Sequence, residues 1–368
     1  MSILPDYVGP SAFGIKMPVI QPGDNIVEMV YDSLVKCRND NLLEDNSIVC
    51  ITESVVARAQ KNYVTLKDIS QDVKTKLSLK ENSKIGVLFP IASRNRFSSI
   101  LKGIAKAVPN GEVYVQFPEK TDEVGNELID HPATGMNYIK FYKEIIKEQG
   151  AKPHIIRSDS HSGLYHNNIE GIIISSIHSR EEDLRIISEY IENCLTLQDL
   201  CNEQQDGRGW SEWGLLGSNL SSEGILKLAP RDSDKITRQI QKKVRNGLGR
   251  NVEVLVYGDG AYKDPSTGIY ELADPVVAFG YTPNLENPRK GVKYKFLADK
   301  GISQGKSKEE IEKMIEEEGK KAHEIQSASM EGTTPRPLKD LAGSLADLVS
   351  GSADAGTPLV IIKGLLNN

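Results

Sequence analysis

Short apolar strands and amphipathic helices alternate between Lys84 and Asn193, and this alternation restricts the fold more than any other feature. The segments IGVLFP, EVYVQFP, HIIRSD and GIIISSI have the length and composition of buried strands. Apolar side chains at helical spacing predict two helices between these strands, and a third helix is expected from Arg180 to Ile191. The stripes of the first two are Phe97, Ile100, Leu101 and Ile104, and Tyr138, Phe141, Tyr142 and Ile145. The pattern is typical of an α/β fold.

The remainder of the chain adds strands and helices that make the predicted class a mixed α/β (α+β) fold. With 368 residues the chain has room for two or three domains. A helix that begins after Asp24 or Asn25 precedes the first strand. The predicted strands are Ile48 to Ile51, Leu255 to Tyr257, the run Pro275 to Phe279, and PLVIIKG at the end. The predicted helical stripes are Ile236, Ile240, Val244 and Leu248, and Leu338, Leu341, Leu345 and Leu348. A charge-dense outer helix, KSKEEIEKMIEEEGKKAHEI, lies between them.

Composition argues against several classes of protein. The formal net charge is -6, whereas general nucleic-acid binding usually requires a basic balance. The four cysteines show no metal-binding spacing, so we expect reduced thiols. The start lacks the features of a signal peptide, and no apolar run approaches about 18 residues. We therefore expect a cytoplasmic protein that binds neither nucleic acid nor a membrane.

A turn rich in carboxylates follows the strand that ends at Gly258. Asp259 lies at the end of that strand, and Asp264, Glu271 and Asp274 come before the next apolar run. If the two strands pair, these acids meet at one mouth, where Mg²⁺ or Mn²⁺ would hold them together. Lys263 in the same loop suits a phosphate. The alternative is an acidic surface turn.

Two other places combine a strand end with groups that bind anions. Thr52, Glu53 and Ser54 begin a helix that carries Arg58, and they fit either a simple helix cap or an anion site. Arg94 and Arg96 follow a strand, where they fit carboxylate or phosphate recognition or a solvated helix start. His131 and His178 lie near loop ends without the spacing of a zinc site.

Several sequence blocks occur in the order found in one enzyme family. MPVIQPGDN, ITESVVARAQ, WGLLGSN, VYGDGAYKDP and TTPRPLKDLAGSLADLVSG…TPLVIIKG together resemble the coenzyme F420-0:L-glutamate ligases, or F420-0 gamma-glutamyl ligases. GLLGSN, YGDGAYKDP and YELADPV are similar to a longer bacterial branch. The shorter archaeal-type members do not match residues 85–205. The predicted organisation is therefore a ligase core, formed by residues 1–84 and 206–368, with an inserted α/β segment at 85–205.

The resemblance implies a homodimeric ligase that depends on GTP or ATP and on Mg²⁺ or Mn²⁺. The nucleotide would phosphorylate a carboxylate, and the amine of L-glutamate would displace the phosphate to form a gamma-glutamyl amide. We expect an anionic small-molecule acceptor that is F420-0-like or folate-like, because the insertion and its polar loop at 122–135 would reshape the acceptor pocket. The alternative is a nucleotide- and metal-binding regulatory protein that has lost ligase activity.

The resemblance also assigns roles to individual residues. The implied nucleotide contacts are Met17, Pro18, Val19, Ile20, Glu53, Ser54, Arg58, where the family prefers Lys, Asn219 and Arg336. Asp259 is the implied metal ligand, and Lys263 completes the catalytic pair with it. A second metal-binding Asp of the family corresponds to Leu216, so Glu271 or Asp274 replaces it, Glu223 reaches back, or the activity has changed. Arg94 and Arg96 would hold the anionic acceptor.

Overall fold

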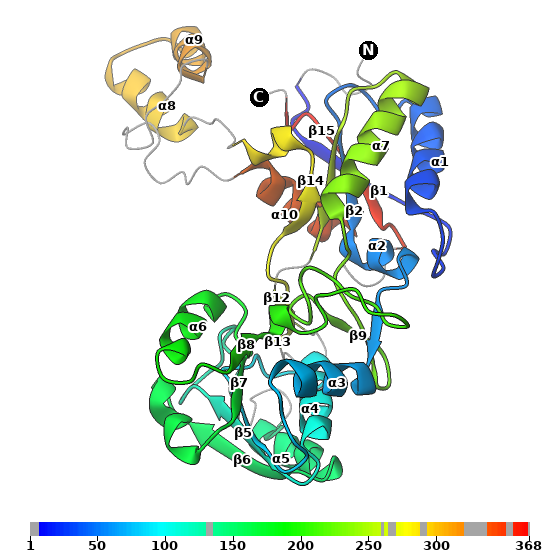
Figure 1. The fold of residues 1–368 in the computed structure, drawn as a ribbon. Helices are drawn as coiled ribbons and strands as arrows, with labels where there is room; N and C mark the ends of the chain where they lie inside the picture. Colours follow the sequence, from blue (N-terminus) through cyan, green and yellow to red (C-terminus); the bar gives the residue numbers. More distant parts are fainter. Residues whose placement is uncertain are drawn as a thin grey trace.

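The computed structural model describes residues 7–129, 135–258, 261–263, 270–287, 293–319, 337–350 and 356–366. Figure 1 shows two lobes, each built around a five-stranded sheet. The sheet of the upper lobe takes its strands from both ends of the chain. The sheet of the lower lobe takes its strands from the middle. The fold is therefore mixed α/β, as predicted.

The upper sheet has the strand order β1-β15-β2-β11-β14. Its strands are β1 (Ser11–Ile15), β15 (Leu359–Lys363), β2 (Ile48–Thr52), β11 (Glu253–Tyr257) and β14 (Ala278–Tyr281). The last strand lies between β1 and β2 and is antiparallel to both, so the predicted association of the two chain ends is confirmed. Strand β11 also pairs with β14, which meets the condition set for the carboxylate-rich turn, although β14 overlaps only the end of the predicted run Pro275 to Phe279. Strands β2 and β11 are parallel, so their carboxyl ends lie side by side.

Helices cover both faces of the upper sheet because its strands are apolar on both faces. Helices α1 (Ile26–Asn39) and α7 (Ser233–Leu248) pack on one face, and α10 (Leu338–Ser350) packs on the other. Asn25 caps α1 by accepting the N–H of Glu28, which confirms one of the two predicted caps. All four apolar residues of the predicted α7 stripe are buried. The short helix α2 (Glu53–Ala59) follows β2 directly.

The contact face of α10 follows the predicted leucine stripe only in part, since Leu338 and Leu345 pack against the core of this lobe but Leu348 does not. Leu348 is 80% exposed, whereas Ala342 and Ala346 are fully buried against the sheet. Gly343 brings the helix so close that a Cβ there would lie 2.6 Å from Cγ1 of Val277. The helix therefore docks on its small residues, because they permit a closer approach than leucines do.

The lower sheet is entirely parallel, with the order β6-β5-β4-β7-β8. Its strands are β4 (Lys84–Leu88), β5 (Glu112–Phe117), β6 (Lys152–Arg157), β7 (Gly171–Ile174) and β8 (Cys194–Thr196). Its helices are α4 (Arg96–Ala107), α5 (Tyr138–Glu148) and α6 (Arg180–Ser188). These elements confirm the predicted α/β segment. The strand order reverses at β4, which is where ligands of open α/β sheets usually bind.

The apolar core of the lower lobe extends beyond residues 85–205. Helix α3 (Leu66–Lys76) packs on α4 so closely that a Cβ at Gly103 would lie 2.5 Å from Cγ2 of Ile69. A small sheet of β3 (Tyr63–Thr65), β10 (Ile225–Lys227) and β9 (Asn219–Ser222) joins the same core through Val64 and Leu226. The lower lobe is therefore larger than the predicted insertion, because its core needs α3 and this sheet as a cover.

The other elements connect the lobes or project from them. The hairpin of β12 (Ala261–Lys263) and β13 (Tyr270–Ala273) lies between the lobes in Figure 1, whereas α8 (Tyr294–Ser303) and α9 (Lys308–Gly319) project outward. Short 3₁₀ turns complete the fold at His161–Gly163, Tyr165–Asn167, Leu197–Asp199 and Pro283–Glu286. The cysteines are free. In the part of the chain that the structure describes, no helix is both long and apolar enough to span a bilayer.

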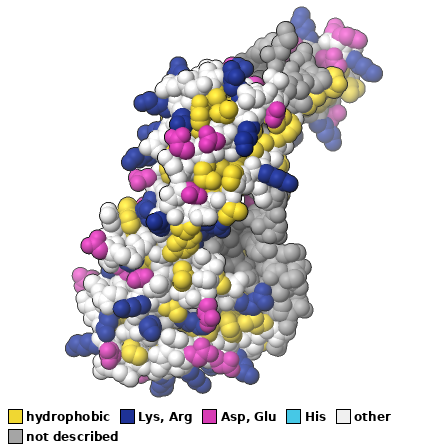
Figure 2. Space-filling view, turned by 90° about the vertical axis from the view of Figure 1, so that its right-hand side faces the viewer, with side chains coloured by type: hydrophobic (Ala, Val, Ile, Leu, Met, Phe, Trp, Pro, Cys, Tyr) yellow, Lys and Arg dark blue, Asp and Glu magenta, His cyan; other side chains and the backbone are white. Residues whose placement is uncertain are grey.

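Acidic and basic side chains are interspersed over the face of the molecule drawn in Figure 2. Lys and Arg alternate there with Asp and Glu on both lobes. This face carries no continuous basic stripe of the kind that binds a nucleic-acid backbone.

Replacing Gly280 with alanine is expected to lower the free energy of unfolding by about 1–3 kcal/mol, because a Cβ there would overpack the contact between β14 and α7. That atom would lie 2.4 Å from the carbonyl carbon of Ser233 and 2.6 Å from the nitrogen of Asp234. Gly9→Ala is the matched control, since nothing lies within 4 Å of a Cβ there. Urea titration of both variants measures the free energy of unfolding. Equal midpoints would show that the backbone around Gly280 shifts to accommodate the Cβ at no cost in stability.

Candidate active site

A polar pocket of about 270 Å³ lies between the start of α2 and the small β3-β10-β9 sheet. It is located where β2 ends, beside the end of the parallel strand β11. Side chains from five elements, which belong to two distant parts of the sequence, converge there. The lining residues are Thr52, Glu53, Ser54, Arg58, Tyr63, Asn219, Leu220, Ser221 and Lys227.

Glu53 and Lys227 form a buried ion pair in this pocket. Glu53 is 5% exposed and Lys227 is 8% exposed. The ammonium nitrogen of Lys227 lies 3.6 Å from Oε1 of Glu53 and also donates a hydrogen bond to the hydroxyl of Ser54. The side-chain amide of Asn219 donates to the same Oε1 at 3.2 Å. The second carboxylate oxygen, Oε2, is buried and has no hydrogen-bond partner within the described residues.

Burial raises the pKa of Glu53, and Lys227 and Asn219 oppose that shift. An isolated buried carboxylate is costly, so the ammonium group and the amide are what keep a charged group in this position. Arg58, which is exposed, adds a second cation to the lining. The charges of Glu53 and Lys227 neutralise each other. The additional positive charge of Arg58 and the hydroxyls of Ser54 and Ser221 therefore make the pocket suited to a polyanion.

The structure brings together four of the predicted nucleotide contacts. Glu53, Ser54, Arg58 and Asn219 all line the pocket, although Asn219 comes from the other end of the sequence. The segment Met17 to Ile20 does not line it. Ile20 is 3% exposed in the core and Val19 is 80% exposed. Arg336 lies outside the described residues.

Sequence reasoning missed Lys227, Tyr63 and Ser221. The only signal for Lys227 was a lysine between two apolar residues, Leu226 and Leu228. Both leucines are fully buried, so strand alternation turns Lys227 to the opposite side, where the start of α2 covers it.

Of the predicted metal ligands, Asp274 lies near the end of β11. Asp274 is 4% exposed, and a Cβ added at Gly258 would lie 2.5 Å from its Oδ2. This carboxylate is therefore adjacent to the residue that precedes Asp259. Asp259 is outside the described residues, and Glu271 and Lys263 belong to the strands β13 and β12. Over the described ranges no three His, Cys, Asp or Glu side chains are arranged to hold a metal ion.

Glu223, the other candidate to replace the family's second metal ligand at Leu216, does not line the pocket, and neither does His178. Leu216 is fully buried in the lower core. Glu223 is exposed in the turn between β9 and β10. The backbone N–H of His178 donates to Glu123, and His131 lies outside the described residues.

Arg94 and Arg96 differ in accessibility. Arg94 is half-buried at the end of the loop after β4. Arg96 is 5% exposed, and its guanidinium group donates to the main-chain oxygens of Leu215, at 3.2 Å, and of Leu216. The expectation that Arg96 is open to an acceptor is therefore not met, because its side chain is directed into the protein interior.

A second, more open pocket of about 560 Å³ lies along α7. Its lining includes the acids Glu212 and Asp232, the bases Lys235 and Arg238, and Phe279. None of the predicted site residues lines it, so the smaller pocket is the candidate active site.

The protein has a mixed α/β fold with a polar pocket whose lining suits a polyanion, and comparison with known families agrees with the resemblance noted above. The model of the F420-0:gamma-glutamyl ligase family matches residues 14–364. The chain belongs to the F420-0:gamma-glutamyl ligase family, and this membership supports a ligase activity. No curated protein matches the chain.

Proposed function

We propose that the protein is a nucleotide- and metal-dependent acid–amine ligase that forms a gamma-glutamyl amide bond. The buried Glu53–Lys227 pair, in a pocket that also contains Arg58 and Asn219, is the observation that carries the proposal. In this proposal, residues 1–84 and 206–368 form the ligase core and 85–205 are an insertion. The resemblance adds a homodimer to the proposal, and the composition adds a cytoplasmic location.

Six side chains of the pocket have roles in binding the phosphates of GTP or ATP. Lys227 supplies a fixed positive charge at the bottom of the pocket, and Arg58 supplies a second one near its opening. The hydroxyls of Ser54 and Ser221 donate to phosphate oxygens. Glu53 orients Lys227 and Asn219 and prevents them from moving apart.

The donors at the end of β11 fit a hard divalent cation. The carboxylate of Asp274 lies against Gly258, the residue that precedes Asp259 in the sequence, and oxygen donors are the ligands that Mg²⁺ and Mn²⁺ prefer. Asp259, Asp274 and Glu271 would hold the ion, and Lys263 on the same hairpin would approach the phosphate. A bound ion would neutralise charge that develops on the transferred phosphoryl group.

The proposed reaction has two steps. A carboxylate oxygen of the acceptor attacks the terminal phosphorus of the nucleotide, and the nucleoside diphosphate leaves. The amine of L-glutamate then attacks the acyl carbon, orthophosphate leaves, and the nitrogen loses a proton. In this proposal the half-buried Arg94 would contact the anionic end of an F420-0-like or folate-like acceptor, whereas Arg96 is buried and would not.

Orthophosphate release from GTP or ATP in the presence of Mn²⁺ and an acceptor panel tests this proposal. We expect release that requires L-glutamate. The alternative is a regulatory protein that binds nucleotide and metal without turnover. Tight nucleotide binding with no release on addition of glutamate and any acceptor would favour that alternative.

Asp259→Asn is expected to abolish Mn²⁺-dependent nucleotide binding while the thermal midpoint stays unchanged, because it removes a charge with little change in volume. Calorimetric titration of nucleotide with and without Mn²⁺ is the measurement. Asp299→Asn, at an exposed position of α8, is the matched control and should behave as the wild type does. Metal dependence that survives in Asp259→Asn would show that Asp259 is only a turn residue.

A further inference from the structure

Arg96 begins α4 in the lower lobe, and its side chain extends into the turn that leads to the candidate active site. The residue is 5% exposed. Its guanidinium group donates to the main-chain oxygens of Leu215 and Leu216. Its Nε is buried and has no hydrogen-bond partner among the residues that the structure describes. Such complete burial of an arginine requires a structural or functional reason, because arginines are almost never buried without partners.

The turn that Arg96 holds ends at the pocket. The N–H of Leu215 donates to the oxygen of Leu197 at 2.9 Å, and the hydroxyl of Ser218 donates to the oxygen of Leu215 at 2.8 Å. The next residue is Asn219, whose amide reaches Glu53 at 3.2 Å. A shift of this turn would therefore move a residue that lines the pocket.

Two carboxylates, one from each lobe, act on the charge of Arg96. Burial lowers the pKa of Arg96 to about 10, and the negative charges of Asp274 and Glu123 oppose that shift. The guanidinium group therefore remains charged at neutral pH. Asp274 belongs to the upper lobe, in the segment between β13 and β14. Glu123 belongs to the loop that follows β5.

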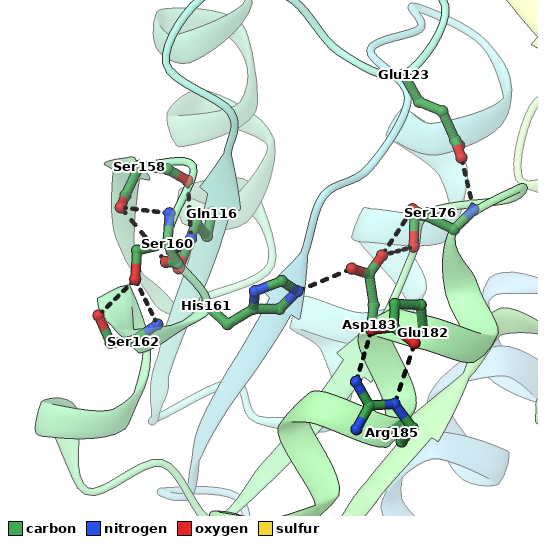
Figure 3. A network of polar contacts seen from close by, with 11 residues as sticks. Gln116, Glu123, Ser158, Ser160, His161, Ser162, Ser176, Glu182, Asp183 and Arg185 are labelled. Atoms are coloured by element: carbon green, nitrogen blue, oxygen red, sulfur yellow. Dashed lines mark hydrogen bonds and ion pairs between the residues drawn. The ribbon is translucent and has the colours of Figure 1, made fainter.

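Glu123 is held in place by the start of α6, as Figure 3 shows. Its carboxylate accepts the N–H groups of Ile177, His178 and Ser179 at 2.8, 2.7 and 2.9 Å. The hydroxyl of Ser179 donates to Asp183 at 2.8 Å, which secures the same turn. The carboxylate that balances Arg96 from the lower lobe therefore has a fixed position.

The turn held by Arg96 is also in contact with the proposed metal end of the site. A Cβ at Gly217 would lie 3.3 Å from the ring of Phe279. A Cβ at Gly258 would lie 2.4 Å from the same ring and 2.5 Å from Oδ2 of Asp274. The ring of Phe279 is thus packed between the turn and Gly258, against which the Asp274 carboxylate lies.

We propose that Arg96 is the positioning residue through which the lower lobe controls the ligase site. Its guanidinium group fixes the turn that presents Asn219 to the nucleotide pocket, and its charge balances the Asp274 carboxylate at the metal end. The inference rests on the proposed function, because it gives this buried cation a role in that reaction. Arg96 contacts neither the nucleotide nor the acceptor.

The two effects of Arg96 have opposite signs. Removing the guanidinium group loosens the turn, which weakens nucleotide binding. The same change removes a positive charge near Asp274, which strengthens the binding of a divalent cation there. A side chain that only supported the fold would weaken both.

Arg96→Met and Arg96→Lys test the inference, with Arg185→Met as the matched control. Arg185 is 62% exposed on α6 and pairs with two nearby surface acids, Glu182 and Glu189. Nucleotide affinity is measured by calorimetry, and Mn²⁺ affinity by electron paramagnetic resonance without nucleotide. In Arg96→Met we expect the nucleotide dissociation constant to rise about 10- to 100-fold, because this is the loss of affinity that corresponds to the free energy of a hydrogen bond from a charged donor. We expect the Mn²⁺ dissociation constant to fall about 3-fold or more.

Arg96→Lys keeps the charge but cannot span both carbonyls, so nucleotide affinity should fall while Mn²⁺ affinity stays at the wild-type value. This variant carries the test if Arg96→Met does not fold. Wild-type affinities in both variants, or equal losses of nucleotide and Mn²⁺ affinity, would overturn the inference. A wild-type protein that binds no nucleotide would instead overturn the proposed function, and the wild-type titration alone detects that result.

Discussion

Replacing Lys227 with methionine is expected to abolish nucleotide binding and to lower the free energy of unfolding by about 3–5 kcal/mol. Lys227 and Glu53 are both more than nine-tenths buried, and their charges lie 3.6 Å apart. The methionine preserves the stem of the side chain but leaves the Glu53 carboxylate buried without its cation. Urea titration measures the stability, and calorimetry measures nucleotide affinity.

The loss of stability in Lys227→Met should depend on pH. Burial raises the pKa of Glu53, and removing Lys227 raises it further. A carboxyl group whose folded pKa is raised binds its proton more tightly in the folded state than in the unfolded state. The penalty is therefore small below the unfolded pKa of about 4.3 and grows as pH rises towards the folded pKa. We expect a larger destabilisation at pH 8 than at pH 5.

The double variant Lys227→Met with Glu53→Gln separates the fold from the function. Neutralising Glu53 removes the unpaired charge, so most of the lost stability should return while nucleotide binding stays absent. Lys147→Met, at an exposed position of α5, is the control and should affect neither property. Nucleotide binding that returns in the double variant would show that Lys227 serves the fold alone.

Arg58→Ala is expected to raise the nucleotide dissociation constant about 10- to 100-fold, because it removes a charge-assisted contact to a phosphate. Arg58 is exposed, so stability should change by less than about 0.5 kcal/mol. Arg58→Lys keeps the positive charge at the pocket opening and should retain most of the affinity. Calorimetry measures the nucleotide affinity of the wild type, Arg58→Ala and Arg58→Lys. Equal affinities in the wild type and Arg58→Ala would place the phosphates elsewhere.

Hydrophobic periodicity predicted most of the strands and helices, because the apolar pattern of each one lies within its own short stretch of sequence. Strands such as β4 and β7 are continuous apolar runs, and the stripe of α7 recurs at helical spacing. The stripe of α10 was predicted less well. Its leucines are the more hydrophobic residues. The helix lies so close to the sheet, however, that the small residues Ala342, Gly343 and Ala346 form the closest contact, and Leu348 is left exposed.

The candidate site was predicted only in part because it depends on contacts between distant segments. The resemblance indicated Glu53, Ser54, Arg58 and Asn219, which the structure brings together. No local pattern marks Lys227 as the partner of Glu53, since the pairing arises when β10 packs under α2. The burial of Arg96 has the same origin. A residue that follows a strand would ordinarily be solvated, and here the Leu215–Leu216 carbonyls cover it.

The account is tested most directly by mass spectrometry of reactions that contain the protein, GTP or ATP, Mn²⁺, L-glutamate and a panel of anionic acceptors. The panel includes the deazaflavin F420-0 and folate-like compounds. We expect one acceptor to gain the mass of a glutamyl residue with stoichiometric release of orthophosphate, and we expect neither product with Lys227→Met. An acceptor panel that stays unmodified, with no orthophosphate released by a protein that binds nucleotide, would contradict the account.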